Sequence, residues 1–318
     1  MVDAGNNNRE TERGPLVSIG MPVYNGEEYL REALDSLLGQ DYEDFELIIS
    51  DNASSDRTPD ICQEYLQRDG RIRYVRQPEN RGPSANFNFL LNEARGDFFM
   101  WAAADDVWDK HFISLLVNAL VANSQCAAAF GPYMFINESG NPFGNGRIRR
   151  PDYSARTALG RLIKLCWYYD DGFFYGLHSL KRIGDLKVPT WTSMGRVSQN
   201  PMNNAYPVLF YLLSVGGFAF VESPTPLWLN RILPETEYRR FQGSFIVVYF
   251  SFLSRKLNVL HKSMRSVYEG SSSLMLATAI IPFLMMRFVF DSVGYWRGFR
   301  LQRVFHKAIN FTLGRNST

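Results

Sequence analysis

Two adjacent carboxylates, Asp105 and Asp106, follow an uncharged and mostly apolar run at residues 98–104. A run of this length predicts a central strand of a sheet that is covered on both faces. The carboxylates would then lie at the carboxyl end of the strand, the edge where open α/β sheets bind ligands. Oxygen ligands there suit Mg2+ or Mn2+, with a diphosphate and water completing the coordination. Alternatively, one of the two aspartates caps a helix that begins near Asp109.

The segments before this pair alternate between predicted strands and predicted helices. Strands are expected at residues 16–22, 45–51, 71–76 and from 97, and helices at 27–38, 58–67 and 84–94. This βαβ spacing predicts an α/β fold with a mostly parallel sheet flanked by helices and right-handed crossovers. Because the second strand ends at Asp51, we expect Asp51 and Asp105 to reach the same edge of the sheet.

Two common nucleotide-binding loops are missing from the sequence. A dehydrogenase-type sheet needs G-x-G-x-x-G after its first strand and a P-loop needs G-x-x-x-x-G-K-[ST], and neither occurs. The first strand is instead followed by VYNGE at residues 23–27. This loop is neither Gly-rich nor basic, which also argues against a nucleotidyltransferase.

Composition indicates a folded protein in a reducing compartment. The 318 residues are 46% hydrophobic and 14% aromatic, which implies a substantial core and excludes disorder throughout. The cysteines Cys62, Cys126 and Cys166 are widely separated and form no CxxC motif, as is typical of buried thiols. Residues 1–14 are polar, without the apolar core of a signal peptide, and are predicted to be a flexible leader. We therefore expect a cytoplasmic catalytic face.

The C-terminal part differs in charge from the rest of the chain. Residues 235–318 hold 12 basic and 4 acidic residues, a net charge of +8, which leaves 22 basic and 28 acidic residues, or −6, in 1–234. Its apolar segments at 245–250 and 274–286 are too short to span a bilayer and are flanked by basic residues. This pattern favours helices lying on an anionic membrane surface, at the inner face of the cell membrane. A homodimer surface and a helical cap on the catalytic domain are alternatives.

A second apolar stretch, residues 205–221, raises the question of a membrane span. It falls short of the ~20 residues that a spanning helix needs. A buried helix that leads into a strand is the better interpretation.

Four segments, taken in order, resemble the signatures of family 2 glycosyltransferases. They are VSIGMPVYN at 17–25, SDNASSD at 50–56, NRGPSAN at 80–86 and ADD at 104–106. The resemblance covers about residues 15–135 and implies a GT-A fold with inverting transfer from a nucleotide-sugar. Together with the change in composition after Pro234, it predicts a catalytic domain at 15–234, with a donor half at 15–135 and an acceptor half at 136–234, and a C-terminal extension at 235–318.

The resemblance also implies a nucleotide-sugar pocket. Its residues would be Pro22, Val23, Tyr24, Glu27, Asp51, Arg81 and Asp105. Asp51 would accept a hydrogen bond from the pyrimidine ring of a UDP- or TDP-type donor. As alternatives, Tyr24 would be a core aromatic residue and Arg81 a solvated turn residue.

The metal motif of that family is incomplete in this chain. Asp105 matches the last carboxylate of the family's D-x-D motif and would bind the divalent cation, Mn2+ or Mg2+. Ala103 stands where the first Asp is expected, which weakens the site by one carboxylate, and Asp106 is the residue that would assist. The cation would neutralise charge on the leaving nucleoside diphosphate.

An inverting transfer also requires a general base for the acceptor hydroxyl. The family supplies an Asp before a helix of the second half. The helix that corresponds is expected to begin at Tyr206, and residues 203–205 before it contain no carboxylate. Asp171, with its neighbour Asp170, is the nearest substitute, and His178 is a further candidate. Solvated turn carboxylates and a structural histidine are the alternatives.

Together these features predict a metal-dependent hexosyltransferase of cell-surface polysaccharide synthesis. Its acceptor would be a glycan or a polyprenol-linked sugar, and no nucleic-acid partner is expected. The alternative is a catalytically silent relative that binds a nucleotide-sugar or a glycan, as Ala103 and the missing carboxylate before Tyr206 would allow.

Overall fold

A computed structural model describes residues 14–168, 170, 172–184, 186–188, 192–193, 196–197 and 202–232. The predicted leader, apart from Gly14, and the predicted extension at 235–318 lie outside the described residues.

The main sheet has seven strands in the order β11-β6-β8-β4-β1-β2-β3. The strands are β1 (Val17–Val23), β2 (Phe45–Asp51), β3 (Ile72–Arg76), β4 (Phe98–Trp101), β6 (Cys126–Phe130), β8 (Leu177–Ser179) and β11 (Gly217–Phe220). Only β8 within this sheet is antiparallel, and it separates β4 from β6. The predicted α/β fold with a mostly parallel sheet is therefore confirmed.

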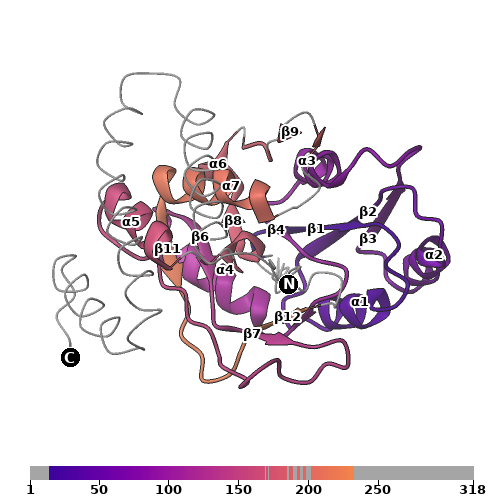
Figure 1. Ribbon diagram of the computed structural model, residues 1–318, viewed down its shortest axis with the longest axis horizontal. Coiled ribbons are helices and arrows are strands. Elements are labelled where there is room, and N and C mark those ends of the chain that lie inside the picture. The colour runs from indigo at the N-terminus through magenta and orange to yellow at the C-terminus, as the bar shows by residue number, and fades with distance from the viewer. Residues whose placement is uncertain are drawn as a thin grey trace, which may run out of the picture.

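Helices cover both faces of this sheet (Figure 1). One face carries α1 (Leu30–Leu38), α2 (Thr58–Arg68) and α4 (Phe112–Ala122), and the other carries α3 (Pro83–Glu93), α6 (Leu180–Ile183) and α7 (Met202–Val215). Helix α5 (Ala158–Tyr168) packs against α7, and a 3-10 helix, η1 (Gly172–Tyr175), precedes β8. Because both faces are covered, exposed polar groups are expected mainly where strands end.

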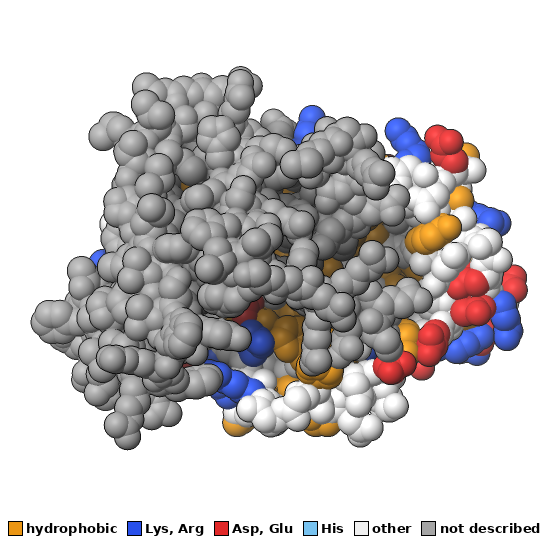
Figure 2. Space-filling model, viewed as in Figure 1, with side chains coloured by type: hydrophobic (Ala, Val, Ile, Leu, Met, Phe, Trp, Pro, Cys, Tyr) orange, Lys and Arg blue, Asp and Glu red, His pale blue; other side chains and the backbone are white. Residues whose placement is uncertain are grey.

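The central strands are apolar because they are buried on both sides. All four residues of β4 are buried, and so is every residue of β1 except the partly exposed Pro22. Gly20 in β1 allows α3 to approach closely, because a Cβ there would lie 2.9 Å from the Phe99 ring and 3.0 Å from Leu90 Cβ. The outer surface is different: Figure 2 shows charged side chains gathered over α1 and α2, where Glu64 forms ion pairs with Arg31 and Arg68.

A second, three-stranded sheet lies beside the carboxyl end of β4. It consists of β5 (Val107–Trp108), β12 (Trp228–Arg231) and β7 (Tyr133–Ile136), with β12 in the centre. Strand β12 is antiparallel to β5 and parallel to β7. A separate two-stranded ribbon is formed by β9 (Thr192–Ser193) and β10 (Arg196–Val197). Since β5 directly follows Asp106, this small sheet brings residues 228–231 next to the carboxylate pair.

Several predicted boundaries are wrong by a few residues. The first helix begins at Leu30 because residues 27–29 form a turn, and the strand expected at 98–104 ends at Trp101, before a turn at residues 104–105. The helix expected from Tyr206 begins at Met202, so the two asparagines before it belong to its first turn.

The interpretation of residues 205–221 as a buried helix leading into a strand is confirmed by α7 and β11. Within the described residues, no helix combines the length and apolar character that crossing a membrane requires.

Candidate active site

The carboxyl ends of three parallel strands meet at one edge of the main sheet. Val23 at the end of β1 pairs with Asp51 at the end of β2, and Trp101 at the end of β4 pairs with Gly20. The loops that follow therefore leave the sheet side by side. The end of β2 and the turn that carries Asp105 lie at the same edge, which is where ligands bind in open α/β sheets.

The loops after β1 and β2, residues 24–29 and 52–57, together with Thr58 at the start of α2, are called the loop pair below. Side-chain oxygens of one segment accept hydrogen bonds from backbone N–H groups of the other. These bonds run from Asn25 N to Ser54 Oγ (2.9 Å), Gly26 N to Thr58 Oγ1 (2.9 Å), Glu27 N to Asp56 Oδ2 (3.0 Å), Ser55 N to Asn25 Oδ1 (2.9 Å) and Arg57 N to Glu27 Oε2 (2.9 Å). The network holds the two loops in register with each other.

Predicted pocket residues occupy different positions within this loop pair. Tyr24 is 51% exposed, which excludes the alternative of a core aromatic residue. Pro22 is partly exposed and Val23 is buried at the end of β1. The Glu27 carboxylate accepts the backbone N–H of Arg57 at the start of α2, so part of its bonding capacity supports the loop.

The Asp51 carboxylate is fully buried. Its Oδ1 accepts the backbone N–H of Ser54 and its Oδ2 accepts the hydroxyl of Tyr74, both at 2.8 Å. The Arg76 Nε lies 3.8 Å from Oδ2. Each carboxylate oxygen keeps a further lone pair. Asp51 therefore supports the loop after β2, and its predicted contact with the nucleobase stays a prediction.

The turn that carries Arg81 is attached to the same edge through Asn52. The backbone N–H of Arg81 donates to Asn52 Oδ1 at 3.1 Å, and Asn52 Nδ2 donates to Asn80 Oδ1 at 2.8 Å. Gly82 follows with φ of 82°, a conformation that glycine adopts without strain. The hydrogen bond from the Arg81 backbone to Asn52 thus positions the exposed Arg81 side chain beside the loop pair.

The Asp106 carboxylate points into the protein. It is 3% exposed, and it accepts hydrogen bonds from the Arg231 backbone N–H at 2.7 Å and from Trp228 Nε1 at 3.0 Å. Burial, and then the negative charge of Asp105, raise the pKa of Asp106 well above its ordinary value. Asp106 therefore anchors the turn to β12, and its predicted catalytic role stays a prediction.

The Asp105 side chain is partly exposed and has a different environment. Its backbone carbonyl accepts a hydrogen bond from Arg231 Nε at 2.8 Å, and among the described residues only its own backbone N–H donates to its carboxylate. Burial raises the pKa of Asp105, and the hydrogen bond from its own backbone N–H and then the Arg231 cation partly oppose this shift. Neither aspartate caps α4, because the N–H of His111 before that helix donates to Asp109.

The residues present fit a cation that is shared with a ligand. No group of three or more His, Cys, Asp or Glu side chains suited to a metal ion occurs in the described part of the chain. Ala103 adds no ligand and the Asp106 carboxylate is already occupied, which leaves Asp105. A single carboxylate suits Mg2+ or Mn2+ when a diphosphate and water supply the other ligands.

Of the base candidates, Asp170 is held firmly. Its Oδ1 accepts the Gly172 backbone N–H at 3.0 Å, its Oδ2 accepts the Tyr133 hydroxyl at 2.8 Å, and Arg149 Nη1 lies 3.7 Å from Oδ2. Burial raises the pKa of Asp170 despite these contacts. This geometry excludes a solvated turn carboxylate at Asp170. Asp171 lies outside the described residues.

His178 lies within the main sheet and not at its edge. It pairs with Phe99 of β4 and Ala128 of β6, has no exposed surface, and its Nε2 lies 3.0 Å from the Phe174 carbonyl oxygen. Burial lowers the pKa of His178 to about 4. These features are typical of a structural histidine.

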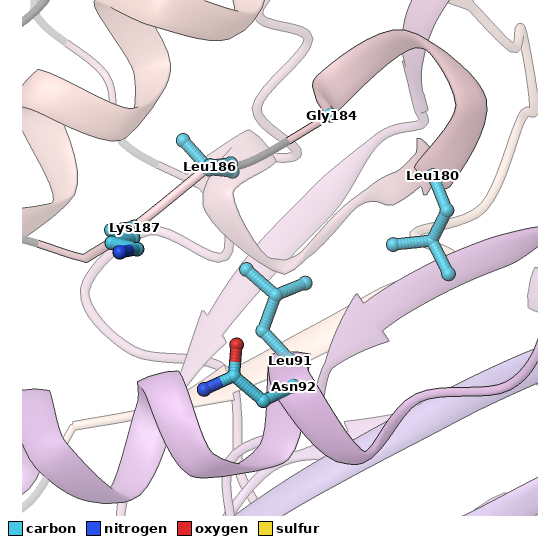
Figure 3. A pocket seen from close by; sticks show the side chains of 6 residues that line it. All are labelled: Leu91, Asn92, Leu180, Gly184, Leu186 and Lys187. Atoms are coloured by element: carbon cyan, nitrogen blue, oxygen red, sulfur yellow. The ribbon is translucent and has the colours of Figure 1, made fainter.

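A cavity of about 240 Å³ lies at the opposite edge of the sheet (Figure 3). It is lined by Leu91, Asn92, Leu180, Gly184, Leu186 and Lys187. The N–H of Leu180 donates to the carbonyl of Asp97, the residue before β4 begins. Because the carboxylates follow the other end of β4, this cavity does not belong to the candidate site.

Sequence reasoning missed Trp228 and Arg231, which bind the carboxylate pair across 122 to 126 residues of chain. The short segment at 228–231 would have suggested a strand, but not which strands pair with it. Tyr74 was also missed, although its place in an edge strand beside β2 made a contact with the end of β2 foreseeable.

Comparison with known proteins agrees with this arrangement. Residues 18–184 match the family model for Glycosyl transferase family 2. Glycosyltransferase GlyA of Streptococcus pneumoniae serotype 4 is 35% identical over 127 residues, which cover 40% of this chain and 18% of GlyA. The TuaG protein of Bacillus subtilis (strain 168), provisionally named as a teichuronic acid biosynthesis glycosyltransferase, is 34% identical over 128 residues. That match covers 40% of this chain and 50% of TuaG.

Solved structures show the same fold. The crystal structure of S. aureus TarS 1-349 has a TM-score of 0.59 at 16% identity and covers 90% of this chain and 76% of that chain. Its complex with UDP-GlcNAc has a TM-score of 0.56 at 18% identity, with coverage of 90% and 77%. The family match spans more than half of the sequence and includes the edge where the β1, β2 and β4 loops converge. The chain belongs to glycosyl transferase family 2, and its fold is the GT-A fold.

Proposed function

We propose that this family 2 glycosyltransferase moves a hexose, with inversion, from a nucleoside-diphosphate donor to a glycan or a polyprenol-linked acceptor. One observation carries the proposal. The Asp105 carboxylate receives no hydrogen bond from any other described residue and lies at the edge where the exposed Tyr24 also emerges. An available carboxylate and an exposed aromatic ring are suited to the diphosphate and base ends of one donor.

The related proteins support the nature of the substrates. TarS has been crystallised with UDP and with UDP-GlcNAc, which favours a UDP-type donor here. The name of TuaG refers to teichuronic acid, which favours a role in cell-surface polysaccharide synthesis. This chain spans at most half of GlyA and TuaG, so these substrates are proposed for it and not transferred directly.

In this proposal Asp105 holds a divalent cation, Mn2+ or Mg2+, together with the donor. The bound cation supplies Lewis-acid neutralisation of the nucleoside diphosphate as it leaves. Tyr24 contacts the nucleobase, and Arg81 adds positive charge near the phosphates. Asp106 fixes the turn from inside the protein. A carboxylate near η1, Asp171 or Asp170, receives the proton of the acceptor hydroxyl.

The first test measures donor binding and donor turnover. Thermal-shift screening with UDP-, GDP- and TDP-sugars, with and without Mn2+, should show stabilisation by UDP-sugars that depends on Mn2+. Donor hydrolysis should fall at least tenfold in Asp105→Ala. Equal hydrolysis by the two proteins would support the rival function, a catalytically silent nucleotide-sugar-binding relative.

The proposal includes a location at the inner face of the cell membrane, through the basic residues 235–318. Deleting this segment should abolish binding to vesicles with anionic lipids while donor binding persists. Unchanged vesicle binding would instead favour a homodimer contact or a cap on the catalytic domain.

A further inference from the structure

Arg231 is the described residue that contacts both members of the carboxylate pair. It lies at the end of β12, and its side chain is 1% exposed. Its backbone N–H donates to the carboxylate of Asp106, and its Nε donates to the backbone carbonyl of Asp105. The same residue thus holds the two aspartates by different chemical groups.

The rest of the guanidinium group reaches two further parts of the protein. Nη1 donates to the carbonyls of Asn137 at 3.2 Å and Glu138 at 2.8 Å, in the loop after β7. Nη2 forms an ion pair with Glu32 of α1, and the guanidinium carbon lies 4.5 Å from the centre of the Tyr29 ring. Arg231 therefore joins α1, the carboxylate turn and the start of the acceptor half.

This arrangement determines which aspartate remains available. The Asp106 carboxylate is occupied by the backbone of Arg231 and the indole of Trp228, so it cannot turn outward without leaving two buried donors unpaired. Arg231 holds Asp105 through the backbone carbonyl, and no other described residue donates a hydrogen bond to the Asp105 carboxylate. Arg231 therefore fixes the backbone of Asp105 without contacting its carboxylate.

We propose that Arg231 is a positioning residue that orients the Asp105 carboxylate toward the diphosphate of the sugar donor. The inference rests on the proposed function for the identity of the ligand, but the restraint on the turn does not depend on it. Arg231 acts by fixing the turn backbone and takes no part in the chemistry.

The role requires arginine and not merely a positive charge. A planar guanidinium offers five N–H donors in a fixed fork, and Arg231 uses its Nε and both Nη atoms on different partners. Lysine in this position keeps the charge but reaches fewer of the carbonyls. Arg231→Lys should therefore loosen the turn without removing the ion pair with Glu32.

A matched control is available in Arg161 of α5. It is also buried, at 7% exposure, and it also donates to carbonyls, from Nε to Leu213 at 2.7 Å and from Nη1 to Ala155 at 3.1 Å. It makes no described contact with the carboxylate turn. Arg161→Lys thus reproduces the loss of a buried guanidinium in the acceptor half.

The experiment compares full-length wild type, Arg231→Lys and Arg161→Lys by hydrogen–deuterium exchange and by titration with UDP in the presence of Mn2+. For Arg231→Lys we expect faster exchange in peptides covering residues 102–107 and about tenfold weaker UDP binding, the usual effect of losing a group that orients a metal ligand. For Arg161→Lys we expect neither change. Unchanged exchange at 102–107 in Arg231→Lys, or equal changes in both variants, would overturn the proposal.

The two readouts separate failure of this inference from failure of the proposed function. If wild type binds no UDP, the proposed donor is wrong, while exchange at residues 102–107 still decides the role of Arg231. If Arg231→Lys does not fold, Glu32→Gln replaces it, because Glu32 is 54% exposed and its loss releases only one arm of the guanidinium. Faster exchange at 102–107 in Glu32→Gln would support the proposal, and unchanged exchange would overturn it.

Discussion

The loop pair and the Asp105–Asp106 turn lie at the same edge of the sheet but are held in different ways. The bonds within the loop pair join residues 29 to 32 positions apart. The turn is held by bonds that cross 122 to 126 positions. One region is thus organised by neighbouring βα units, and the other depends on β12, which follows nearly the whole acceptor half.

This difference indicates where structural faults would act. The two loops of the loop pair support each other, so each hydrogen bond between them contributes a modest part of the free energy of unfolding. Among the described residues the turn has fewer hydrogen bonds, and the two to the Asp106 carboxylate are buried, so the loss of either should cost more free energy of unfolding. The carboxylate that is proposed to meet the donor therefore depends on the correct folding of the acceptor half.

The largest effect is expected from Asp106→Ala. The change leaves the Arg231 N–H and the Trp228 indole without their buried acceptor, which should cost roughly 3 kcal/mol of unfolding free energy. Asp105→Ala is the matched control and should change stability by less than about 0.5 kcal/mol. Urea denaturation measures both, and similar losses would remove the distinction between the two aspartates.

Acid should lower the free energy of unfolding through His178, which lies in β8 between β4 and β6. The folded pKa is about 4 and lies below the ordinary value of 6.5, so between these pH values the unfolded chain binds a proton that the folded chain rejects. Stability is fully present above pH 6.5 and falls as the pH drops, by up to about 3 kcal/mol near pH 4. Urea denaturation at pH 7.5, 5.5 and 4.5 should show this loss in wild type and a smaller one in His178→Gln. An equal loss of stability with falling pH in wild type and His178→Gln would contradict this prediction.

The loop pair should carry donor contacts that the fold does not need. Tyr24→Ala should weaken UDP binding about tenfold, since stacking of a base on an aromatic ring contributes about 1–3 kcal/mol. Its melting temperature should not change, because Tyr24 is 51% exposed. Isothermal titration of UDP with Mn2+ measures the affinity. Leu66→Ala, which removes an exposed apolar residue of α2, is the control and should bind UDP like wild type.

The smallest effect is expected from Asp56→Ala, which removes the acceptor for the N–H groups of Glu27 and Thr58. The expected cost is about 1 kcal/mol, similar to the loss of a helix cap. Burial alone would raise the pKa of Asp56, but these hydrogen bonds outweigh it and lower the pKa. The contribution is therefore present above the ordinary value of 3.8 and is lost as the pH falls below it. Urea midpoints of wild type and variant should differ at pH 6 and converge at pH 2, and a loss as large as that of Asp106→Ala would erase the contrast.

The donor half was largely predictable from local patterns. The strand predicted at 45–51 has the same bounds in the structure, and the helix predicted at 58–67 ends one residue later, at Arg68. The strand and the helix were both predicted from the spacing of hydrophobic residues within a few positions, and this spacing recurs in each βα unit. Since parallel strands end at a common edge, the convergence of Asp51 and Asp105 followed as well.

Boundaries near the site were less predictable. The apolar run at 98–104 contains more residues than the strand, because Ala102 lies beyond the last strand residue but is still buried and donates its N–H to the Gly20 carbonyl of β1 at 2.9 Å. Apolar composition reports burial, and burial continues past the last residue of the strand. The exposure of Tyr24 and the full burial of Asp51 likewise depend on neighbours that local patterns do not specify.

The sequence by itself determined the α/β class, the family and the carboxylates available at the strand ends, because these depend on residue types at short spacing. Only the tertiary structure decided that Asp106 faces inward and Asp105 stays available. That choice depends on Arg231 and Trp228, which reach the turn only after β12 has paired with β5 and β7. A contact across more than 120 residues leaves no periodic trace in a single sequence, since many other positions could provide the same donor groups.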